Sequence, residues 1–362
     1  MKIQVSKENF LNAIQTVQNI VSPRTTLPIL GNMLLETRNN NLTIITTDLD
    51  VGISCTIPVN IQTEGSITLP SKKLGDIIKE LPAGEVTIIV KKNNLVEIEC
   101  EKIHFKLMGL PKDEFPKFPE FKDKETLQIE QPTLKAMLGL TSFAVSHEET
   151  RYILNGILVE VKDNNLKLVA TDGRRLAMAN SKLPTASKKE LSVIIPIKAV
   201  TELNRNLKDE GKVSIVLGTN QILFDIDGTL IVSRLIEGTF PNYQQVIPPP
   251  TETKIRLSRE GFLAAIRRAN LLATPDFQAI KLEVFKNKMV ISKSTPDVGE
   301  SREELDIEYQ GKELMVGFNP HYLIDVLKNL KQESLDLELT DADKPGVIRT
   351  EDYLYLVLPM RL

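Results

Sequence analysis

Apolar residues near the start of the chain follow a helical spacing. From Phe10 to Val17 they recur every three or four positions behind a helix-starting serine, so the pattern predicts a helix over residues 6–19. The pattern then changes to two short apolar runs, at 33–36 and 42–46, separated by turn-forming asparagines. These runs predict a β-hairpin.

This helix-and-hairpin pattern repeats along the chain. The turn Asn39-Asn40-Asn41 has a counterpart in Asp163-Asn164-Asn165, 124 residues later. The same offset relates further pairs: Leu30 and Leu154, Glu36 and Glu160, Leu42 and Leu166, Ile44 and Leu168, and Thr46-Thr47-Asp48 and Ala170-Thr171-Asp172. A third copy follows the second at an offset of 128 residues in its helix, around Phe262, and 123 in its strands, around Glu283. A constant offset over about forty residues indicates an internal repeat.

Each copy has a second half with another helix. A proline stands at or just before the first turn of the predicted helices at 71–80, 197–208 and 319–331, where its fixed φ is tolerated. Phe115-Pro116 and Phe240-Pro241 close the first two copies, 125 residues apart. The sequence therefore predicts three similar α+β domains, each with two helices and two sets of strands. Their predicted bounds are 1–122, 123–248 and 249–362.

Positive charge is concentrated in the predicted helices. The chain has 45 Lys and Arg against 48 Asp and Glu, so its net charge of −3 offers no overall attraction to a polyanion. The six predicted helices contain 13 basic and 6 acidic residues. Their ranges are 6–19, 71–80, 132–146, 197–208, 258–272 and 319–331. Because lysine and arginine are also common on solvated helix faces, this sorting alone does not separate a polyanion-binding surface from ordinary helix exteriors.

Composition excludes several classes of protein. Cys55 and Cys100 are the only cysteines, too few for a disulfide framework or a cysteine-rich metal site. No run approaches the roughly 18 apolar residues of a membrane span, and the first residues form no apolar signal segment. The three histidines, 104, 147 and 321, lack metal-ligand spacing, and no phosphate loop or serine nucleophile elbow occurs. We expect a cytoplasmic protein without a cofactor, a metal, a membrane contact or catalytic activity.

One segment favours a different function. Asp225-Ile226-Asp227-Gly228-Thr229 is similar to the first motif of haloacid dehalogenase-type phosphatases, where one aspartate is the nucleophile and the other the acid/base beside a metal ion. That chemistry needs a helix after the loop, whereas 229–232 has the pattern of a strand. A hairpin turn at Asp227-Gly228 explains the same residues, so the phosphatase is the minor alternative.

Four segments are distinctive as a set: His147 to Gly156, Ala170 to Ala177, Phe240 to Tyr243 and Leu358 to Leu362. Together they resemble the bacterial DNA polymerase III beta subunit family, the sliding clamps, and the resemblance runs over the whole chain. It implies a head-to-tail homodimer, with three DNA-clamp domains per chain, that closes a six-domain ring with helices inside and sheets outside. Such a ring encircles duplex DNA and tethers the replicative polymerase for processive synthesis.

The resemblance also implies a pocket for short linear peptides between the second and third domains. The replicative DNA polymerase, the clamp loader and other DNA replication and repair proteins would dock there. Matched by position, the pocket comprises Leu154, Thr171, Gly173, Arg174, Arg175, Leu176, Pro241, Val246, Tyr322, Pro345, Leu356, Leu358, Pro359, Met360 and Arg361. The alternative for Leu356, Leu358 and Met360 is ordinary core of the final strand. Two positions depart from better-known members: Arg174 stands where a histidine is common, and Gln244-Gln245 replaces an arginine pair.

Family positions and the charged helices together suggest a DNA surface of Arg24, Lys72, Lys73, His147, Glu148, Arg151, Tyr152, Lys198, Arg205 and Phe277. Glu148 is unfavourable beside phosphate, and Tyr152 and Phe277 suit a protein core as well as a stacking surface. For the dimer contact the resemblance implies Lys73, Ile77, Phe105 and Leu107 of the first domain against Leu271, Leu272, Glu303 and Glu304 of the third. A monomeric peptide-binding scaffold without DNA is a further alternative, because it would share the pocket but not the ring.

Overall fold

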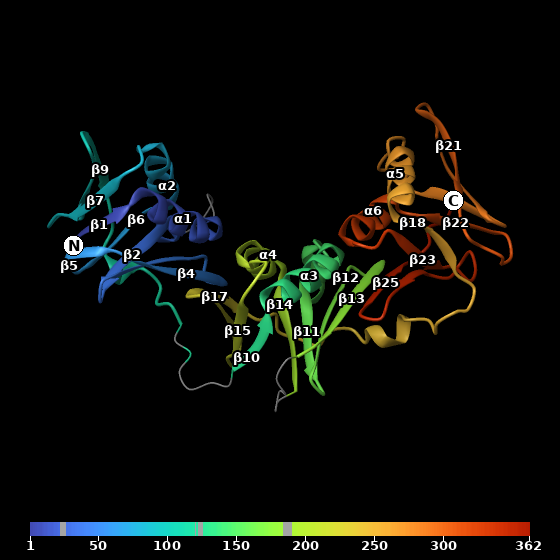
Figure 1. Cartoon of the computed structure of the whole chain (residues 1–362), viewed down its shortest axis with the longest axis horizontal. Helices are drawn as coiled ribbons and strands as arrows, with labels where there is room; N and C mark the ends of the chain where they lie inside the picture. Colours follow the sequence, from blue (N-terminus) through green and yellow to red (C-terminus); the bar gives the residue numbers. More distant parts are fainter. Residues whose placement is uncertain (22–26, 120, 122–125, 184–189) are drawn as a thin grey trace. The chain divides into compact units, whose positions relative to one another are not determined.

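The computed structural model describes residues 1–21, 27–119, 121, 126–183 and 190–362. Contacts divide the chain into two compact units, drawn in Figure 1. Unit 1 contains residues 1–132 and 198–235, and unit 2 contains residues 133–197 and 236–362. The middle copy of the repeat is therefore divided between the units, and the three-domain division at 122 and 248 stays a prediction.

Unit 1 holds two antiparallel sheets. The smaller sheet has the order β5 (Asn60–Thr63), β1 (Lys2–Ser6), β7 (Glu85–Val90), β8 (Leu95–Cys100) and β9 (Ile103–Met108). The larger sheet has the order β10 (Thr126–Glu130), β15 (Lys212–Leu217), β16 (Gln221–Ile226), β17 (Thr229–Arg234), β4 (Val51–Pro58), β3 (Asn41–Thr47), β2 (Asn32–Arg38) and β6 (Ser66–Pro70). Strands of the first and second copies meet where β4 pairs with β17.

Unit 2 repeats this plan. Its larger sheet has the order β14 (Leu191–Pro196), β11 (Gly156–Lys162), β12 (Asn165–Thr171), β13 (Arg175–Lys182), β25 (Tyr353–Val357), β24 (Gly346–Arg349), β23 (Ser334–Glu338) and β18 (Ile255–Ser258). Its smaller sheet has the order β21 (Gly299–Asp306), β20 (Lys288–Thr295), β19 (Ile280–Phe285) and β22 (Leu314–Phe318). The second and third copies meet where β13 pairs with β25. Neighbouring copies thus share sheets.

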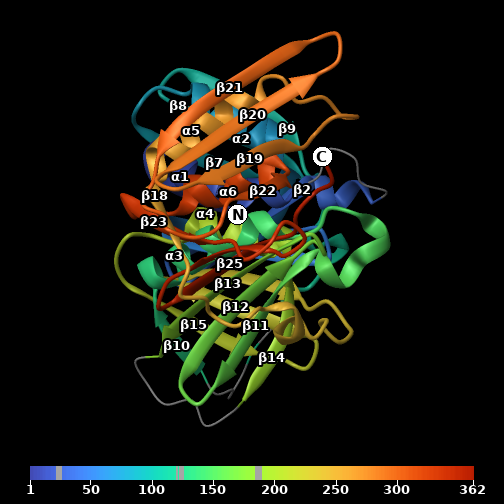
Figure 2. The ribbon, with the colours of Figure 1, turned by 90° about the vertical axis from the view of Figure 1, so that its right-hand side faces the viewer.

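Two α-helices belong to each copy in the described residues. They are α1 (Lys7–Val17) and α2 (Ser71–Glu80), α3 (Gln131–Thr141) and α4 (Ile197–Asn206), and α5 (Arg259–Asn270) and α6 (Pro320–Asn329). Helix α1 begins where Ser6 accepts a hydrogen bond from the Asn9 amide, and it buries Phe10 and Val17 as predicted. Helix α1 packs beside α2, and α5 beside α6 (Figures 1 and 2). Short 3₁₀ turns are η1 (Gln18–Ile20), η2 (Pro28–Gly31), η3 (Lys112–Glu114), η4 (Ser142–Ala144), η5 (Glu149–Leu154) and η6 (Tyr243–Val246).

The repeat is present in the turns as well as in the strands. The predicted hairpin is confirmed in both copies, by β2 with β3 and by β11 with β12. At the end of β3, the Asp48 carboxylate accepts hydrogen bonds from the amides of Asp50 and Val51. At the end of β12, Asp172 accepts from Arg174 and Arg175 in the same way. The Thr-Asp motif therefore folds an identical turn twice.

The phosphatase-like segment is a β-hairpin. Asp227 and Gly228 turn the chain between β16 and β17 with φ of 51° and 87°, and a strand follows where the phosphatase needs a helix. Lys208 Nζ, at 2.9 Å, and Gln131 Nε2, at 3.2 Å, donate to the Asp227 carboxylate. Asp225 accepts from the Gly228 amide. The phosphatase alternative is therefore wrong, because both carboxylates serve the turn.

Candidate functional site

The segment that follows β25 lies along two other elements of unit 2. The Leu358 amide donates to the Arg174 carbonyl at 2.9 Å, and the Met360 amide donates to the Gly317 carbonyl at 2.8 Å. Leu358 is 40% exposed, while Leu356 on β25 is only 2% exposed. The core alternative therefore holds for Leu356 and fails for Leu358. Main-chain bonds fix this segment and leave its side chains available.

A buried apolar cluster supports the candidate pocket from below. Its members are Leu158, Val169, Leu176, Ile194, Phe240, Tyr243, Val347, Leu354 and Leu356. Leu154 and Ile247 pack against it and are partly exposed. Val246 in η6 is 54% exposed beside this cluster's Tyr243, and Pro241 is exposed as well. The structure therefore brings predicted pocket residues from β13, β25 and η5 to one cluster, and Val246 follows the cluster's Tyr243 in η6.

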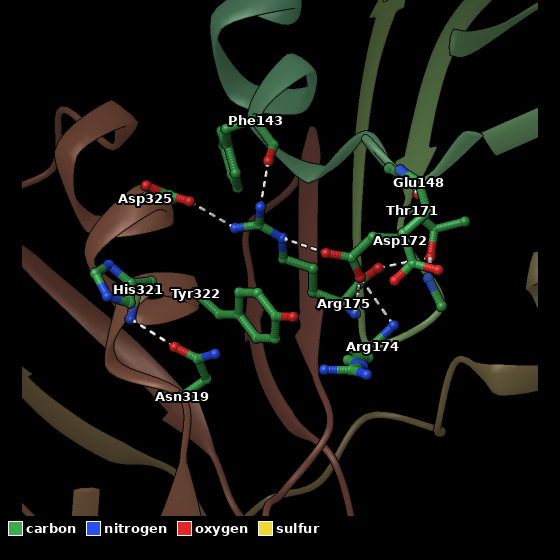
Figure 3. Close-up of polar contacts among 12 residues, drawn as sticks. Phe143, Glu148, Thr171, Asp172, Arg174, Arg175, Asn319, His321, Tyr322 and Asp325 are labelled. Carbon is green, nitrogen blue, oxygen red and sulfur yellow. Dashed lines mark hydrogen bonds and ion pairs between the residues drawn. The ribbon is translucent and has the colours of Figure 1, made fainter. Parts of the chain in front are cut away.

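Arg175 lies at the centre of a polar network beside this cluster (Figure 3). Its guanidinium donates to Asp172 at 3.0 Å, to Asp325 at 2.7 Å and to the Phe143 carbonyl at 2.5 Å. The Tyr322 ring lies 4.5 Å from the guanidinium carbon, a cation–π distance. Arg175 is only 8% exposed, so it holds other pocket residues in place rather than presenting a surface of its own.

The charge of Arg175 is secured by its partners. Burial opposes the charged form, but the hydrogen bond to Asp325 and the nearby Asp172 outweigh it and raise the pKa of Arg175. The backbone of Tyr322 is also held, because the hydroxyl of buried Tyr355 donates to the Tyr322 carbonyl at 2.8 Å. Burial raises the pKa of Tyr355, so this hydroxyl keeps its proton.

Several residues of this network were missed from the sequence. Asp172 belongs to the repeated Thr-Asp motif, which is a signal for the turn but not for the contact with Arg175. Phe143, Asp325 and Gly317 carried no signal, since each acts through a partner distant in the chain. Other predicted pocket residues lie on or next to the turn: Thr171 donates to the Arg175 carbonyl at 2.6 Å, and Gly173 and Arg174 are exposed. Pro345, just before β24, is half-buried.

The predicted DNA-binding residues of unit 1 have different surroundings. Arg24 lies outside the described residues. Lys72 and Lys73 on α2 are exposed and form no ion pair with any described residue. Lys198 on α4 pairs with Asp48, and Arg205 pairs with Glu202 at 2.7 Å. The cations of α2 are therefore the more available ones.

In unit 2, Arg151 is already engaged. It pairs with Glu148 at 3.1 Å and donates to the Asp172 carbonyl at 2.9 Å, while His147 and Glu148 are exposed. Tyr152 is 58% exposed and Phe277 is 49% exposed. The core alternative is therefore wrong for both aromatic side chains.

Four of the predicted dimer residues lie on two edge strands: Phe105 and Leu107 on β9, and Glu303 and Glu304 on β21. Phe105 on β9 is 38% exposed, and Leu271 after α5 is 80% exposed. Ile77, Leu107 and Leu272 are half-buried, and Lys73 is exposed. Both acidic candidates have partners within the chain: Glu303 pairs with Arg268, and Glu304 pairs with Arg302 at 2.7 Å and with Lys288 at 3.6 Å. The hydrogen bond from Arg268 lowers the pKa of Glu303.

Two further properties concern the described part of the chain. None of its helices is long and apolar enough to cross a membrane. Within the same residues, no three His, Cys, Asp or Glu side chains come together in a way that could hold a metal ion.

Comparison with known proteins identifies the family. Models of the N-terminal, central and C-terminal domains of the DNA polymerase III beta subunit match residues 1–119, 128–242 and 244–361. The beta sliding clamp of Chlamydia pneumoniae is 31% identical over all of this chain and 99% of the relative. The DNA polymerase sliding clamp of Bacillus subtilis has a TM-score of 0.96 at 34% identity, covering 100% of this chain and 99% of that one. The clamp of Bartonella birtlesii bound to griselimycin has a TM-score of 0.95 at 35% identity, with full coverage of both chains. The chain therefore belongs to the DNA polymerase III beta subunit family, the bacterial sliding clamps.

Proposed function

We propose that two copies of this chain form a ring around duplex DNA and that the ring tethers the replicative polymerase during synthesis. The ring has six domains, three from each copy with the bounds 1–122, 123–248 and 249–362. It acts in the cytoplasm as a processivity factor without a cofactor or catalysis of its own. Family membership supports the clamp function, and the strand edges of the chain support the ring.

The observation that carries this proposal is a repeated strand pairing. Where the first and second copies meet, β4 pairs with β17 so that Cys55 lies opposite Thr229. Where the second and third copies meet, β13 pairs with β25 so that Ala179 lies opposite Tyr353. Both residues of the second pair lie 124 positions after those of the first, so the junctions have one register.

The strands that form these junctions have equivalents that remain at the edge of a sheet. Strand β21 follows β20 as β13 follows β12, and β9 follows β8 as β17 follows β16. Both β21 and β9 lie at the ends of their sheets in the described chain. An unpaired strand edge is a template for another strand. A third junction with the same register joins β21 of one chain to β9 of a second chain. In it, Glu303 lies opposite Ile103, and Arg302 lies opposite His104.

This head-to-tail contact closes on itself in a dimer, as heterologous contacts do when their rotation completes a circle. The exposed Phe105 and Leu271 supply apolar surface for it. Because Glu303 and Glu304 are paired within the chain, an ion pair with Lys73 is a minor contribution. The apolar contact and the strand pairing hold the ring.

The cations of the helices give the ring a weak hold on DNA phosphates. Such contacts bind duplex without reading its sequence, which suits movement along it. The segment around Leu358 and Met360, with Val246 and Tyr322, receives short peptides of the polymerase, the clamp loader and repair proteins. Apolar anchors of these peptides provide most of the affinity.

Engineered cysteines test the register directly. Opposite residues on paired strands have Cα atoms about 4.5 to 5.5 Å apart, within the reach of a disulfide. The pair His104→Cys with Arg302→Cys is expected to give a covalent dimer on oxidation, since both native residues are exposed and Cys55 and Cys100 are buried. The matched control, His104→Cys with Glu304→Cys, is two residues out of register. Equal cross-linking in both variants, or a monomer by light scattering, would overturn the ring.

A further inference from the structure

The three copies present equivalent rows of side chains on one face of their sheets. Across β2, β3 and β4 the row is Leu34, Ile45 and Ser54. Across β11, β12 and β13 it is Leu158, Val169 and Met178. Across β19, β20 and β21 it is Lys281, Ser292 and Arg302. The third row thus has Lys281 where both other rows have a leucine, and Arg302 where they have Ser54 and Met178.

In the first two copies the chain itself covers this row. Phe115, in the segment after β9, packs with Leu34 and Ile45 in one buried cluster. Phe240, in the segment after β17, packs with Leu158 and Val169 in another. The face therefore accommodates a crossing segment of polypeptide.

The three copies also share the start of this crossing. A single β-bridge joins Leu110 to Thr68 in the first copy and Ile236 to Ile194 in the second. Met360 forms the equivalent bridge to Gly317 in the third. Met360 therefore lies where the two covering segments begin.

The third row borders an open groove of about 650 Å³, which we call the third-copy groove. Its lining includes Phe277, Lys281, Lys293, Arg302, Met360 and Leu362. Residues of the hairpin of β20 and β21 contribute to this lining, and Figure 2 shows the long ribbon of that hairpin. The neighbouring row on these strands, Leu282 and Ile291, is buried on the side of α5. The groove therefore lies on the face away from the helices.

One end of the groove is apolar and fixed. Phe277 is 49% exposed and Leu362 is 63% exposed at this end, next to the half-buried Met360. Lys293 is 5% exposed, and its ammonium donates to the carbonyls of Phe277 and Ala279 at 2.7 and 2.9 Å. The loop that presents Phe277 is thus anchored to β20, and the groove continues directly from the segment proposed to dock peptides.

We propose that the third-copy groove binds an extended segment of the docked partner protein, running on from its pocket-bound peptide. An apolar residue of this segment packs on Phe277 and Leu362, and a carboxylate lies over Lys281 and Arg302. This inference rests on the proposed docking function. Both cations now pair with a glutamate of their own strand, Glu283 at 3.0 Å and Glu304 at 2.7 Å. An incoming carboxylate therefore exchanges one exposed ion pair for another and adds modest affinity.

The position of the groove favours this occupant over two others. Duplex DNA would meet the helices in the proposed ring, and the groove is on the opposite face. A second copy of the chain is proposed to pair with the edge of β21, whereas the groove covers the faces of β19 to β21. A partner segment alone accounts for the continuity with Met360.

The test uses the full chain and the purified replicative polymerase of the same organism, with affinity measured by surface plasmon resonance. Arg302→Glu and Phe277→Ser are each expected to weaken polymerase binding about 5-fold, since one rim contact is lost. The effect of Arg302→Glu is expected to shrink at 0.5 M salt, because exposed charges are screened, while that of Phe277→Ser persists. Lys286→Glu is the matched control: it reverses an exposed cation in the turn between β19 and β20, outside the groove, and should leave binding unchanged.

Leu358→Ser distinguishes failure of the proposed peptide docking from failure of the third-copy groove. If the segment after β25 docks the polymerase, Leu358→Ser should abolish polymerase binding. If Leu358→Ser binds the polymerase as the wild type does, the docking function itself is contradicted. If Leu358→Ser abolishes binding while Arg302→Glu and Phe277→Ser bind as the wild type does, the third-copy groove is not a docking surface. Unchanged melting temperatures of all four variants establish that each loss reflects contact rather than unfolding.

Discussion

Arg175 joins three parts of unit 2 through one side chain. It holds the turn at Asp172, helix α6 at Asp325 and the carbonyl of Phe143. Removing one partner of a buried charge pair leaves the others uncompensated, so Arg175→Met is expected to lower the free energy of unfolding by about 3 kcal/mol. Urea denaturation measures this change. Arg174→Met, at an exposed neighbouring position, is expected to cost less than about 0.5 kcal/mol, and equal costs would contradict the network role.

Glu202 is a residue whose ionisation opposes folding. Its side chain is buried, and Oε2 has no hydrogen-bond partner among the described residues. Burial raises the pKa of this carboxyl, although Arg205 and Lys198 act in the opposite direction. Between the unfolded-state pKa, about 4.3, and the raised folded pKa, the folded protein binds more protons than the unfolded one. The stability of the wild type should therefore fall as pH rises through this window and stay lower above it.

Glu202→Gln removes this penalty. The variant is expected to lose that decline and to be more stable than the wild type at pH 7, by about 1 kcal/mol, because a buried charge without full compensation is replaced by an amide. Thermal unfolding measured from pH 4 to 8 follows the difference. Glu210→Gln, at an exposed position, serves as the control and should parallel the wild type throughout. A constant offset of Glu202→Gln at every pH would show that ionisation is not the cause.

At the scale of elements, the segment after β25 depends on a glycine of β22. A Cβ on Gly317 would lie 2.6 Å from the Met360 carbonyl oxygen and 2.9 Å from the Leu362 side chain. Gly317→Ala is therefore expected to displace this segment, reducing polymerase affinity about 10-fold, since docking depends on positioned anchors. Melting temperature and binding are measured together. Gly139→Ala in α3 meets nothing closer than 3.9 Å and should bind normally with about 1 kcal/mol of added stability.

Elements with local causes could be predicted from the sequence, and contacts between distant elements could not. The hairpin of β2 and β3 followed from two apolar runs and turn-forming asparagines, and Asn39 and Asn40 indeed adopt positive φ of 49° and 58°. Helix α1 followed from its spacing and its cap. The bond from Arg175 to Asp325 spans 150 residues, so no local pattern carries it. The Thr-Asp turn illustrates both cases, because its repeat was visible while the different partners of Asp48 and Asp172 were not.

Sharing of sheets between copies belongs to the same class of non-local features. Strand β4 and strand β17 each have an ordinary strand pattern, and nothing in either pattern specifies the other as its partner. The family resemblance supplied the expected pocket residues, yet it grouped the buried Arg175 with the exposed Leu358. Only burial and hydrogen bonding separate the residue that positions the pocket from the residue that presents a surface.

For the whole molecule, the proposed ring makes retention on DNA a matter of topology rather than affinity. The chain has a net charge of −3, and cations such as Lys198 and Arg205 are paired with carboxylates, so phosphate contacts alone should hold DNA weakly. A closed ring nevertheless remains on circular duplex, because it leaves only by opening, and it slides off linear duplex. Gel filtration of clamp loaded on nicked circular DNA, before and after linearisation, is expected to show retention on the circle alone.

Phe105→Asp provides the matched variant for this experiment. Phe105 lies on β9, and a carboxylate there would enter the apolar contact between the two chains. It should weaken this junction, because a charge is costly where it cannot be hydrated. We expect this variant to dissociate from circular and linear DNA alike while its helix cations are unchanged. Retention of the wild type on both forms would mean that direct contacts hold the DNA, and the ring would then be unnecessary. Retention of Phe105→Asp on circles alone would mean that the junction lies elsewhere than at β9.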